Sequence, residues 1–129
     1  MDNNLILQAA DLEKQIHEME NHLKFVDTQL TELSKFGQEI LQFNNSNSNS
    51  VLTSLGKGVY VPAQISEKEL FVEVGAGVVV KKTPEQLVKV IEAQVRGLNE
   101  SREYIISRLE SSSSALQELV DSLEKEYKE

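Results

Sequence analysis

Residues 51–82 read VLTSLGKGVYVPAQISEKELFVEVGAGVVVKK, and this stretch decides the fold of the chain. Apolar residues, many of them β-branched, alternate with other residues along 59–65 and 70–75, and a short valine run follows at 78–80. A period of two with β-branched side chains is typical of β-strands. With a further strand at 51–55, the sequence predicts about four short strands in two hairpins.

Glycine and polar residues separate these strands. Gly56-Lys57-Gly58 is expected to turn the first strand into the second. We expect residues 66–69, Ser-Glu-Lys-Glu, to turn one hairpin, and residues 75–77, Gly-Ala-Gly, to mark a bulge or bend before the last strand. Pro62 cannot donate a backbone hydrogen bond, so it belongs at a sheet edge or a bulge.

A sheet of so few short strands is only marginally stable by itself, because isolated hairpins bury little apolar surface. Its exposed edges must pair with something, and the same sheet in other subunits is the simplest partner. The sequence therefore predicts an oligomer held together by the apolar side chains of the strands. These residues are Val59, Val61, Ile65, Leu70, Val72, Val74, Val78 and Val80.

On each side of the β-rich stretch, mostly apolar residues recur at alternating steps of four and three. In the first arm they are Leu5, Ala9, Leu12, Ile16, Met19, Leu23, Val26, Leu30, Leu33, Gly37 and Ile40. In the second arm they are Val88, Ile91, Val95, Leu98, Arg102, Ile105, Leu109, Ser112, Leu116, Leu119 and Leu123. A period of 3.5 gives each helix a narrow apolar seam that needs another helix.

The predicted fold class is therefore mainly α with a small β region: a long antiparallel coiled-coil hairpin with two β-hairpins at its base. Pairing of each arm with another chain is the alternative, but pairing within one chain benefits from a high effective concentration. We expect a single domain, 1–129, made of arm 1 (1–43), a flexible polar connector (44–50), the β-hairpins (51–82) and arm 2 (83–129). Thr83-Pro84-Glu85-Gln86 predicts a capping box at the start of arm 2.

The composition excludes several classes of protein. The formal net charge is −8 and the acidic residues concentrate on the arms, so we expect no nucleic-acid binding, because the arms repel phosphate. The chain has no cysteine, no signal-peptide pattern and no apolar stretch long enough to span a membrane. We therefore expect a cytoplasmic protein without a membrane partner.

No group of residues has the spacing that catalysis or cofactor binding requires. His17 and His22 lie five positions apart, whereas histidine pairs that bind metal on a helix lie three or four apart. Residues 75–77 begin a G-x-G pattern, but Val80 occupies the place of the third glycine. We expect no enzymatic activity, no metal and no cofactor.

Two segments of the β-rich stretch resemble those of a known family, the prefoldins. Residues 55–65 (LGKGVYVPAQI) and 74–83 (VGAGVVVKKT), placed between two coiled-coil arms, are similar to a prefoldin subunit of the α class. The resemblance spans essentially the whole chain. It implies a hexamer of two α and four β-class subunits, in which the hairpins form a double β-barrel body and six coiled-coil tentacles surround a cavity.

The resemblance also implies an ATP-independent co-chaperone that holds non-native client proteins and delivers them to a group II chaperonin. The tip of the tentacle would combine the start of arm 1 with the end of arm 2. There the candidate client-binding residues are Leu5, Ile6, Leu12, Ile16, Leu116, Leu119, Val120 and Leu123. Ile6 and Val120 lie off the seam, so we expect these two apolar side chains to be partly exposed.

A structural role is the competing hypothesis. The chain could form scaffolds or filaments through its sheet edges, or serve in a transcription-linked, prefoldin-like complex. The seam residues among the client-binding candidates also stabilise the coiled coil, whichever function the protein has.

Overall fold

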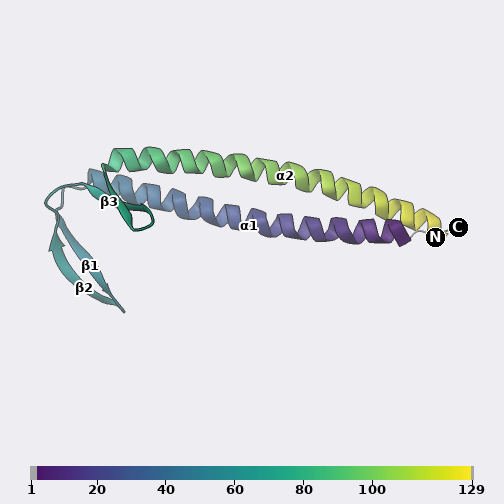
Figure 1. The fold of residues 1–129 in the computed structure, drawn as a ribbon, viewed down its shortest axis with the longest axis horizontal. Coiled ribbons are helices and arrows are strands. Elements are labelled where there is room, and N and C mark those ends of the chain that lie inside the picture. Colours follow the sequence, from purple (N-terminus) through teal and green to yellow (C-terminus); the bar gives the residue numbers. More distant parts are fainter. Residues whose placement is uncertain (1–2, 129) are drawn as a thin grey trace. The chain divides into compact units, whose positions relative to one another are not determined.

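The computed structural model describes residues 3–128 of the chain. In chain order its elements are α1 (Asn3–Asn45), β1 (Ser50–Gly56), β2 (Val59–Gln64), β3 (Leu70–Gly75), β4 (Val78–Lys82) and α2 (Pro84–Lys128). The predicted fold class is confirmed, since the chain consists of two long helices with two small antiparallel β-hairpins between them in the sequence (Figure 1). Helix α1 extends into the predicted connector, and the single domain stays a prediction.

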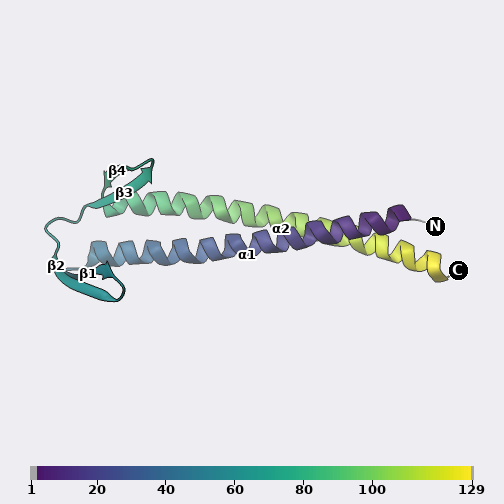
Figure 2. The ribbon, with the colours of Figure 1, turned by 60° about the horizontal axis from the view of Figure 1, so that its bottom comes forward.

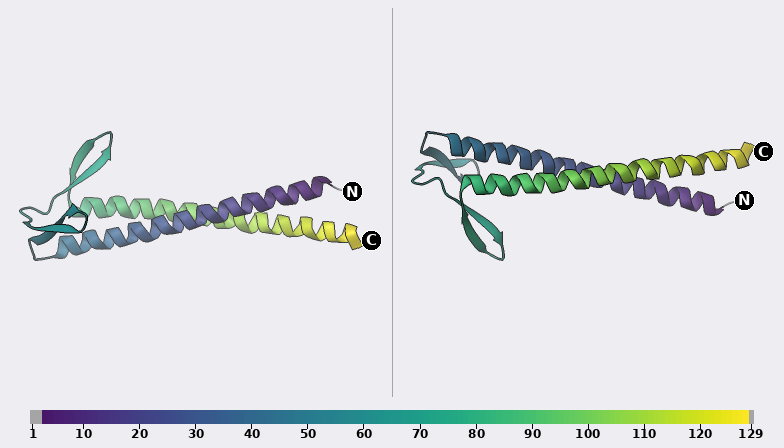
Figure 3. Two further views of the ribbon diagram at one scale, coloured as in Figure 1. Left: turned by 90° about the horizontal axis from the view of Figure 1, so that it is seen from below. Right: turned by 90° about the horizontal axis from the view of Figure 1, so that it is seen from above.

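The chain forms two compact units, and each is described by itself. The helical unit comprises the described residues of Met1–Glu32 and Val95–Glu129, and the hairpin unit comprises Leu33–Gln94. In the helical unit, the two helix segments run side by side in opposite directions and cross at a shallow angle (Figure 3). The two ends of the described chain therefore lie at the same end of this unit.

Burial in the helical unit follows the predicted seam. Every seam position of this unit is buried or half-buried, from Leu5 to Leu30 on α1 and from Val95 to Leu123 on α2. Val26 and Ile105 are the most buried, with 2% and 5% of their surface exposed. The heptad interpretation is therefore confirmed here residue by residue, including the half-buried Arg102 and Ser112.

In the hairpin unit, the end of α1 and the start of α2 pack against each other. Ile40, Leu87 and Ile91 are buried, and a Cβ on Gly37 would lie 3.4 Å from Cγ2 of Ile91. The glycine at this seam position thus lets the two helices approach without leaving a large void.

Helix α2 begins with the predicted capping box. The Thr83 amide donates to Oε1 of Gln86 over 3.0 Å, and the Gln86 amide donates to Oγ1 of Thr83 over 3.2 Å. Two amides that lack partners within the helix are satisfied reciprocally, and Pro84 needs none because it has no N–H. This fixes the boundary between β4 and α2.

Each hairpin forms its own two-stranded sheet, β1 with β2 and β3 with β4 (Figure 2). The two central turn residues have positive φ in both hairpins: 53° and 78° at Lys57 and Gly58, and 50° and 75° at Ala76 and Gly77. These values are those of a type I′ turn, whose twist matches that of the flanking strands. A bulge precedes each turn, so the two hairpins repeat one backbone design.

Two turn predictions are therefore corrected. Residues 66–69 do not turn a hairpin, because β2 pairs with β1 and β3 pairs with β4. Residues 75–77 form the hairpin turn itself and not merely a bend before the next strand. The physical reason is that a tight antiparallel turn needs residues with positive φ, which the Gly-x-Gly segments supply and residues 66–69 do not.

The segment between the hairpins instead caps the end of α1. The Nζ of Lys68 donates to the carbonyl oxygens of Asn44, at 3.1 Å, and Ser46, and lies 6.0 Å from the centre of the Phe43 ring. A lysine at a helix C-terminus satisfies carbonyls that have no partner within the helix. The flexibility of the connector stays a prediction.

The first prediction concerns Gly37. Gly37→Ala should raise the free energy of unfolding by about 1 kcal/mol, because alanine favours the helix and the new Cβ meets Ile91 at an ordinary contact distance. Urea denaturation followed by circular dichroism measures this change. Gly97→Ala is the matched control, because no heavy atom lies within 4 Å of its Cβ and it reports helix propensity alone. Destabilisation at Gly37 with stabilisation at Gly97 would contradict the packing described here.

The second prediction concerns pH. The pKa of Glu85 lies below its ordinary value of 4.5, first because its own backbone amide donates to the carboxylate and second because the Asn44 side chain donates to it. The carboxylate therefore stabilises the fold at neutral pH, and this contribution is lost as the pH falls through the lowered pKa.

Glu85→Gln should accordingly melt at a lower temperature than the wild type at pH 7, and the difference should shrink below pH 4.5. Thermal melts between pH 7 and pH 3 test this. Glu92→Gln removes the same charge beyond the first turn of α2, where the helix dipole acts weakly, and should show a smaller difference at every pH.

Candidate functional site

The described residues hold no constellation for catalysis. No three or more His, Asp or Glu side chains among residues 3–128 lie where they could hold a metal ion. None of the described helices carries an apolar stretch long enough to cross a membrane. Large apolar side chains are exposed on the helical unit and on the hairpins, and these two surfaces are the candidates.

The first candidate surface is the arm end, defined as residues 3–25 of α1 and 106–127 of α2. No side chain described in these two segments is buried, whereas Val26 and Ile105 directly beside them are. The seam continues through the arm end, but each of its apolar side chains stays partly open to solvent. The arm end thus offers a line of half-covered apolar groups.

The predicted client-binding residues all lie in the arm end. Ile6 is 43% exposed, as expected for a residue off the seam, and Val120 is half-buried. The half-buried seam members of the set are Leu5, Leu12, Ile16, Leu116, Leu119 and Leu123. Whether these residues bind clients stays a prediction.

Sequence reasoning missed three exposed residues of the arm end. Leu7, Phe25 and Tyr127 are 65%, 60% and 68% exposed, more than any of the predicted residues. All three lie off the heptad seam, and a large apolar residue at such a position was the available signal.

A shallow groove of about 560 Å³ also lies between the helices of the helical unit. Gly97 lines the groove without a side chain, and two other lining residues are hydrogen-bonded, since the Arg108 guanidinium donates to the Tyr104 hydroxyl over 3.2 Å. Its other lining residues are Met19, His22, Glu100, Ser101 and Ile105. Among its titratable lining residues, the hydrogen bond found is the one from Arg108 to Tyr104.

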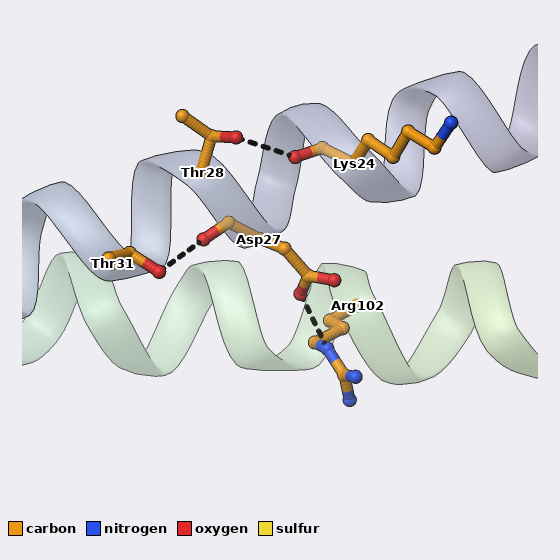
Figure 4. Close-up of polar contacts among 5 residues, drawn as sticks. All are labelled: Lys24, Asp27, Thr28, Thr31 and Arg102. Carbon is orange, nitrogen blue, oxygen red and sulfur yellow. Dashed lines mark hydrogen bonds and ion pairs between the residues drawn. The ribbon is translucent and has the colours of Figure 1, made fainter.

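An ion pair crosses from one helix to the other near the inner limit of the arm end. Nε of Arg102 lies 2.7 Å from Oδ1 of Asp27, as Figure 4 shows. Thr28 and Thr31 donate back to the carbonyls of Lys24 and Asp27 on the same helix. Arg102 is a charged residue at a position of the apolar seam, and it reaches across the seam to a partner on α1.

The second candidate surface is the β1–β2 hairpin, whose strand register sets two faces. One face carries Val51, Thr53, Val61 and Ala63, and the other carries Leu52, Ser54, Tyr60 and Pro62. Large apolar side chains are exposed on both faces, so other parts of this chain cover neither face.

The β3–β4 hairpin has two unlike faces. Leu70, Val72, Val80 and Lys82 share a half-buried face, and Phe71, Glu73, Val79 and Lys81 share an exposed one. Lys81 pairs with Glu69 at 2.5 Å and lies 6.0 Å from the centre of the Phe71 ring. The Glu69 carboxylate, hydrogen-bonded to Lys81, raises the pKa of Lys81, and the same bond lowers the pKa of Glu69.

The predicted subunit-contact residues divide accordingly. Val59, Val61, Val74 and Val78 are exposed, whereas Ile65, Leu70, Val72 and Val80 are half-buried within the chain. The prediction followed one face of β2, β3 and β4 and included no residue of β1. It therefore missed other exposed apolar residues of the hairpins, namely Val51, Leu52, Leu55, Tyr60, Phe71 and Val79.

The sequence profile of the family described as "Prefoldin subunit" matches residues 12–129, which is most of the chain. The chain belongs to the prefoldin family. It is 25% identical, over 97 residues, to a protein named prefoldin subunit alpha from Picrophilus torridus, covering 75% of this chain and 70% of that one. Filamentous PFD from Methanocaldococcus jannaschii, solved by cryo-EM, has the same fold, with a TM-score of 0.73 at 15% identity over 94% of this chain and 99% of that chain.

Membership in the prefoldin family indicates the class of protein to which the two candidate surfaces belong. Prefoldin is a chaperone family and not an enzyme family, and prefoldin subunits form oligomeric complexes with other prefoldin subunits. The chain is therefore a chaperone-type subunit. The predicted family and fold are confirmed.

The third prediction tests the interhelical ion pair of this prefoldin subunit. Arg102→Ala should lower the free energy of unfolding by roughly 1 kcal/mol, because it removes a half-exposed ion pair and the packing of the arginine stem. Arg102→Leu should recover or exceed the wild-type value, because leucine continues the apolar seam and leaves Asp27 open to water. Urea denaturation of the three proteins measures both changes. A leucine variant less stable than the alanine variant would contradict the seam position assigned to residue 102.

Proposed function

We propose that this prefoldin subunit is an ATP-independent co-chaperone subunit of the α class that captures non-native polypeptides at the arm end. The observation that carries the proposal is the lack of any buried side chain among the described residues of the arm end, together with the exposure of Ile6, Leu7 and Tyr127. Apolar groups gathered at one end of a coiled coil suit the apolar segments that an unfolded protein exposes.

Two observations support the α class. The chain carries two β-hairpins, and the relative from Picrophilus torridus is named an alpha subunit. In the proposed assembly, two copies of this chain combine with four β-class prefoldin subunits through the hairpins, and the assembly delivers its client to a cytoplasmic group II chaperonin.

The energetics of the arm end suit reversible holding. Covering about 100 Å² of apolar surface is worth roughly 2.5 kcal/mol, so a contact of one or two residues is weak by itself. Several arm ends that act on one client convert later contacts into intramolecular ones and raise the overall affinity. A client held in this way can still be released without nucleotide hydrolysis.

The fourth prediction removes the two exposed residues near the start of α1. A chain with Ile6→Ser and Leu7→Ser, assembled with a β-class subunit, should need about tenfold more complex to suppress aggregation of a chemically denatured client. Light scattering without ATP measures the aggregation. The matched control replaces two exposed apolar residues of α1 outside the arm end, Phe36→Ser and Leu41→Ser, and should behave like the wild type.

Native mass spectrometry of each complex separates capture from assembly. Full suppression of aggregation by an intact complex that carries the Ile6 and Leu7 substitutions would contradict client capture at the arm end. An equal loss with the Phe36 and Leu41 substitutions would show that apolar surface anywhere on the arm suffices, which also contradicts the proposal.

A further inference from the structure

The arm end has two long edges, one on each side of the line along which α1 and α2 meet. At the first edge lie the residues that directly follow every second seam residue, for example Leu5 and Leu119. At the second edge lie the residues that directly precede the other seam residues, for example Ile16 and Leu109. Because the two helices are antiparallel (Figure 3), positions of the same kind on α1 and α2 come together at one edge.

The second edge is mostly polar. Gln15 and His22 of α1 and Arg108 of α2, which all precede seam residues, line one shallow hollow, so positions of this kind do lie together. In the arm end the second edge comprises Gln8, Gln15, His22, Arg108, Ala115 and Ser122. It combines neutral polar side chains with a guanidinium group, and it offers little apolar surface to an unfolded client.

The first edge is apolar and acidic, and we call it the acidic edge. It comprises Ile6, Glu13 and Glu20 of α1 and Ile106, Ser113, Val120 and Tyr127 of α2. Ile6 and Tyr127 are 43% and 68% exposed, whereas Ile106 and Val120 are half-buried. None of the described residues of this edge is basic. Exposed apolar groups of the arm end therefore lie beside carboxylates.

The two carboxylates of the acidic edge are available to a partner. Glu13 and Glu20 are exposed, and neither forms an ion pair with another residue of the described chain. They lie one heptad apart, which is about 10 Å along a helix. A polypeptide that covers the neighbouring apolar groups also removes water from these carboxylates, and this costs free energy unless the polypeptide supplies a cation.

We propose that the acidic edge selects client segments in which apolar residues are accompanied by lysine or arginine. The inference rests on the proposed function, and it names the class of client and the side of the arm end on which the client lies. Apolar client side chains cover Ile6 and Val120, and basic client groups reach Glu13 and Glu20. A span of about 10 Å corresponds to roughly three residues of extended chain, so two basic residues three or four positions apart reach both carboxylates.

Tyr127 adds to the same preference. Its ring is exposed at the acidic edge, and the face of an aromatic ring attracts lysine and arginine side chains. Ion pairs and cation–π contacts at an exposed site are weak and are screened by salt. The apolar contacts therefore supply most of the affinity for a client, and the charges decide which client is preferred.

Fluorescence anisotropy with labelled peptides tests the inference on the complex of this chain with a β-class subunit. Three unstructured peptides share their apolar residues and differ at two positions, which carry lysine, glutamate or glutamine. The wild-type complex should bind the lysine peptide about fivefold more tightly than the glutamate peptide at low salt. Raising the salt concentration to about 0.5 M should abolish this ratio and leave binding of the glutamine peptide intact.

Charge reversal assigns the preference to the acidic edge. Glu13→Lys combined with Glu20→Lys should lower the affinity ratio of lysine to glutamate peptide by about threefold or more. The matched control is Asp11→Lys combined with Glu18→Lys, which changes the net charge equally on the same helix. Both control residues lie toward the second edge, since Asp11 accepts a hydrogen bond from Gln15 and Glu18 lines the hollow with Gln15. The control complex should keep the wild-type ratio.

The ratio is measured within each complex, so a loss of folding weakens both peptides alike and does not imitate the expected change. An unchanged ratio after reversal of Glu13 and Glu20, or an equal fall with the Asp11 and Glu18 substitutions, would overturn the inference. Equal binding of all three peptides by the wild type would also overturn it while leaving client capture intact. Failure of the glutamine peptide to bind would instead contradict the proposed function itself.

Discussion

A helix in a two-stranded coiled coil has only one neighbour, and much of this protein follows from that limit. Each seam residue is covered by the opposite helix and left open on its flanks, which is why few side chains are buried. The buried apolar residues described are Val26, Ile40, Pro84, Leu87, Ile91 and Ile105. The helices are stabilised by a long row of small contributions instead of a compact core. The same geometry leaves apolar surface within reach of other molecules along the whole arm.

The hairpins have a similar limit, because each strand has only one neighbouring strand to pair with its backbone groups. Two strands cannot satisfy their outer amides and carbonyls by themselves, and a two-stranded sheet has two uncovered faces. The two hairpins differ in the burial and charge of their strands, although their turns have the same backbone conformation. The β3–β4 hairpin has a half-buried face and charges on its strands, whereas the β1–β2 hairpin leaves apolar side chains exposed on both faces.

Most of the fold was readable from the sequence, because its signals are local and periodic. The heptads identified the seam apart from the buried Leu87, which lies beside the predicted Val88, and the Thr83–Gln86 spacing identified the capping box. The prediction of a hairpin turn at residues 66–69 was wrong. The position of a tight turn depends on which residues can adopt positive φ, and the polarity of a segment does not reveal this ability. The exposure of Leu7 and Phe71, and the reach of Arg102 to Asp27, depend on the other helix or strand and could not be read from one segment.

The antiparallel pairing of α1 with α2 also sets an order of folding. Near the hairpins the interacting residues are close in sequence, as in the Asn44–Glu85 pair 41 positions apart, whereas the Asp27–Arg102 pair is 75 positions apart. Loop-closure entropy therefore favours contacts beside the hairpins first, with the helices then zipping toward the chain termini. The arm end forms last and frays first, so the segment with the most accessible apolar side chains is also the one whose backbone opens at the lowest free-energy cost.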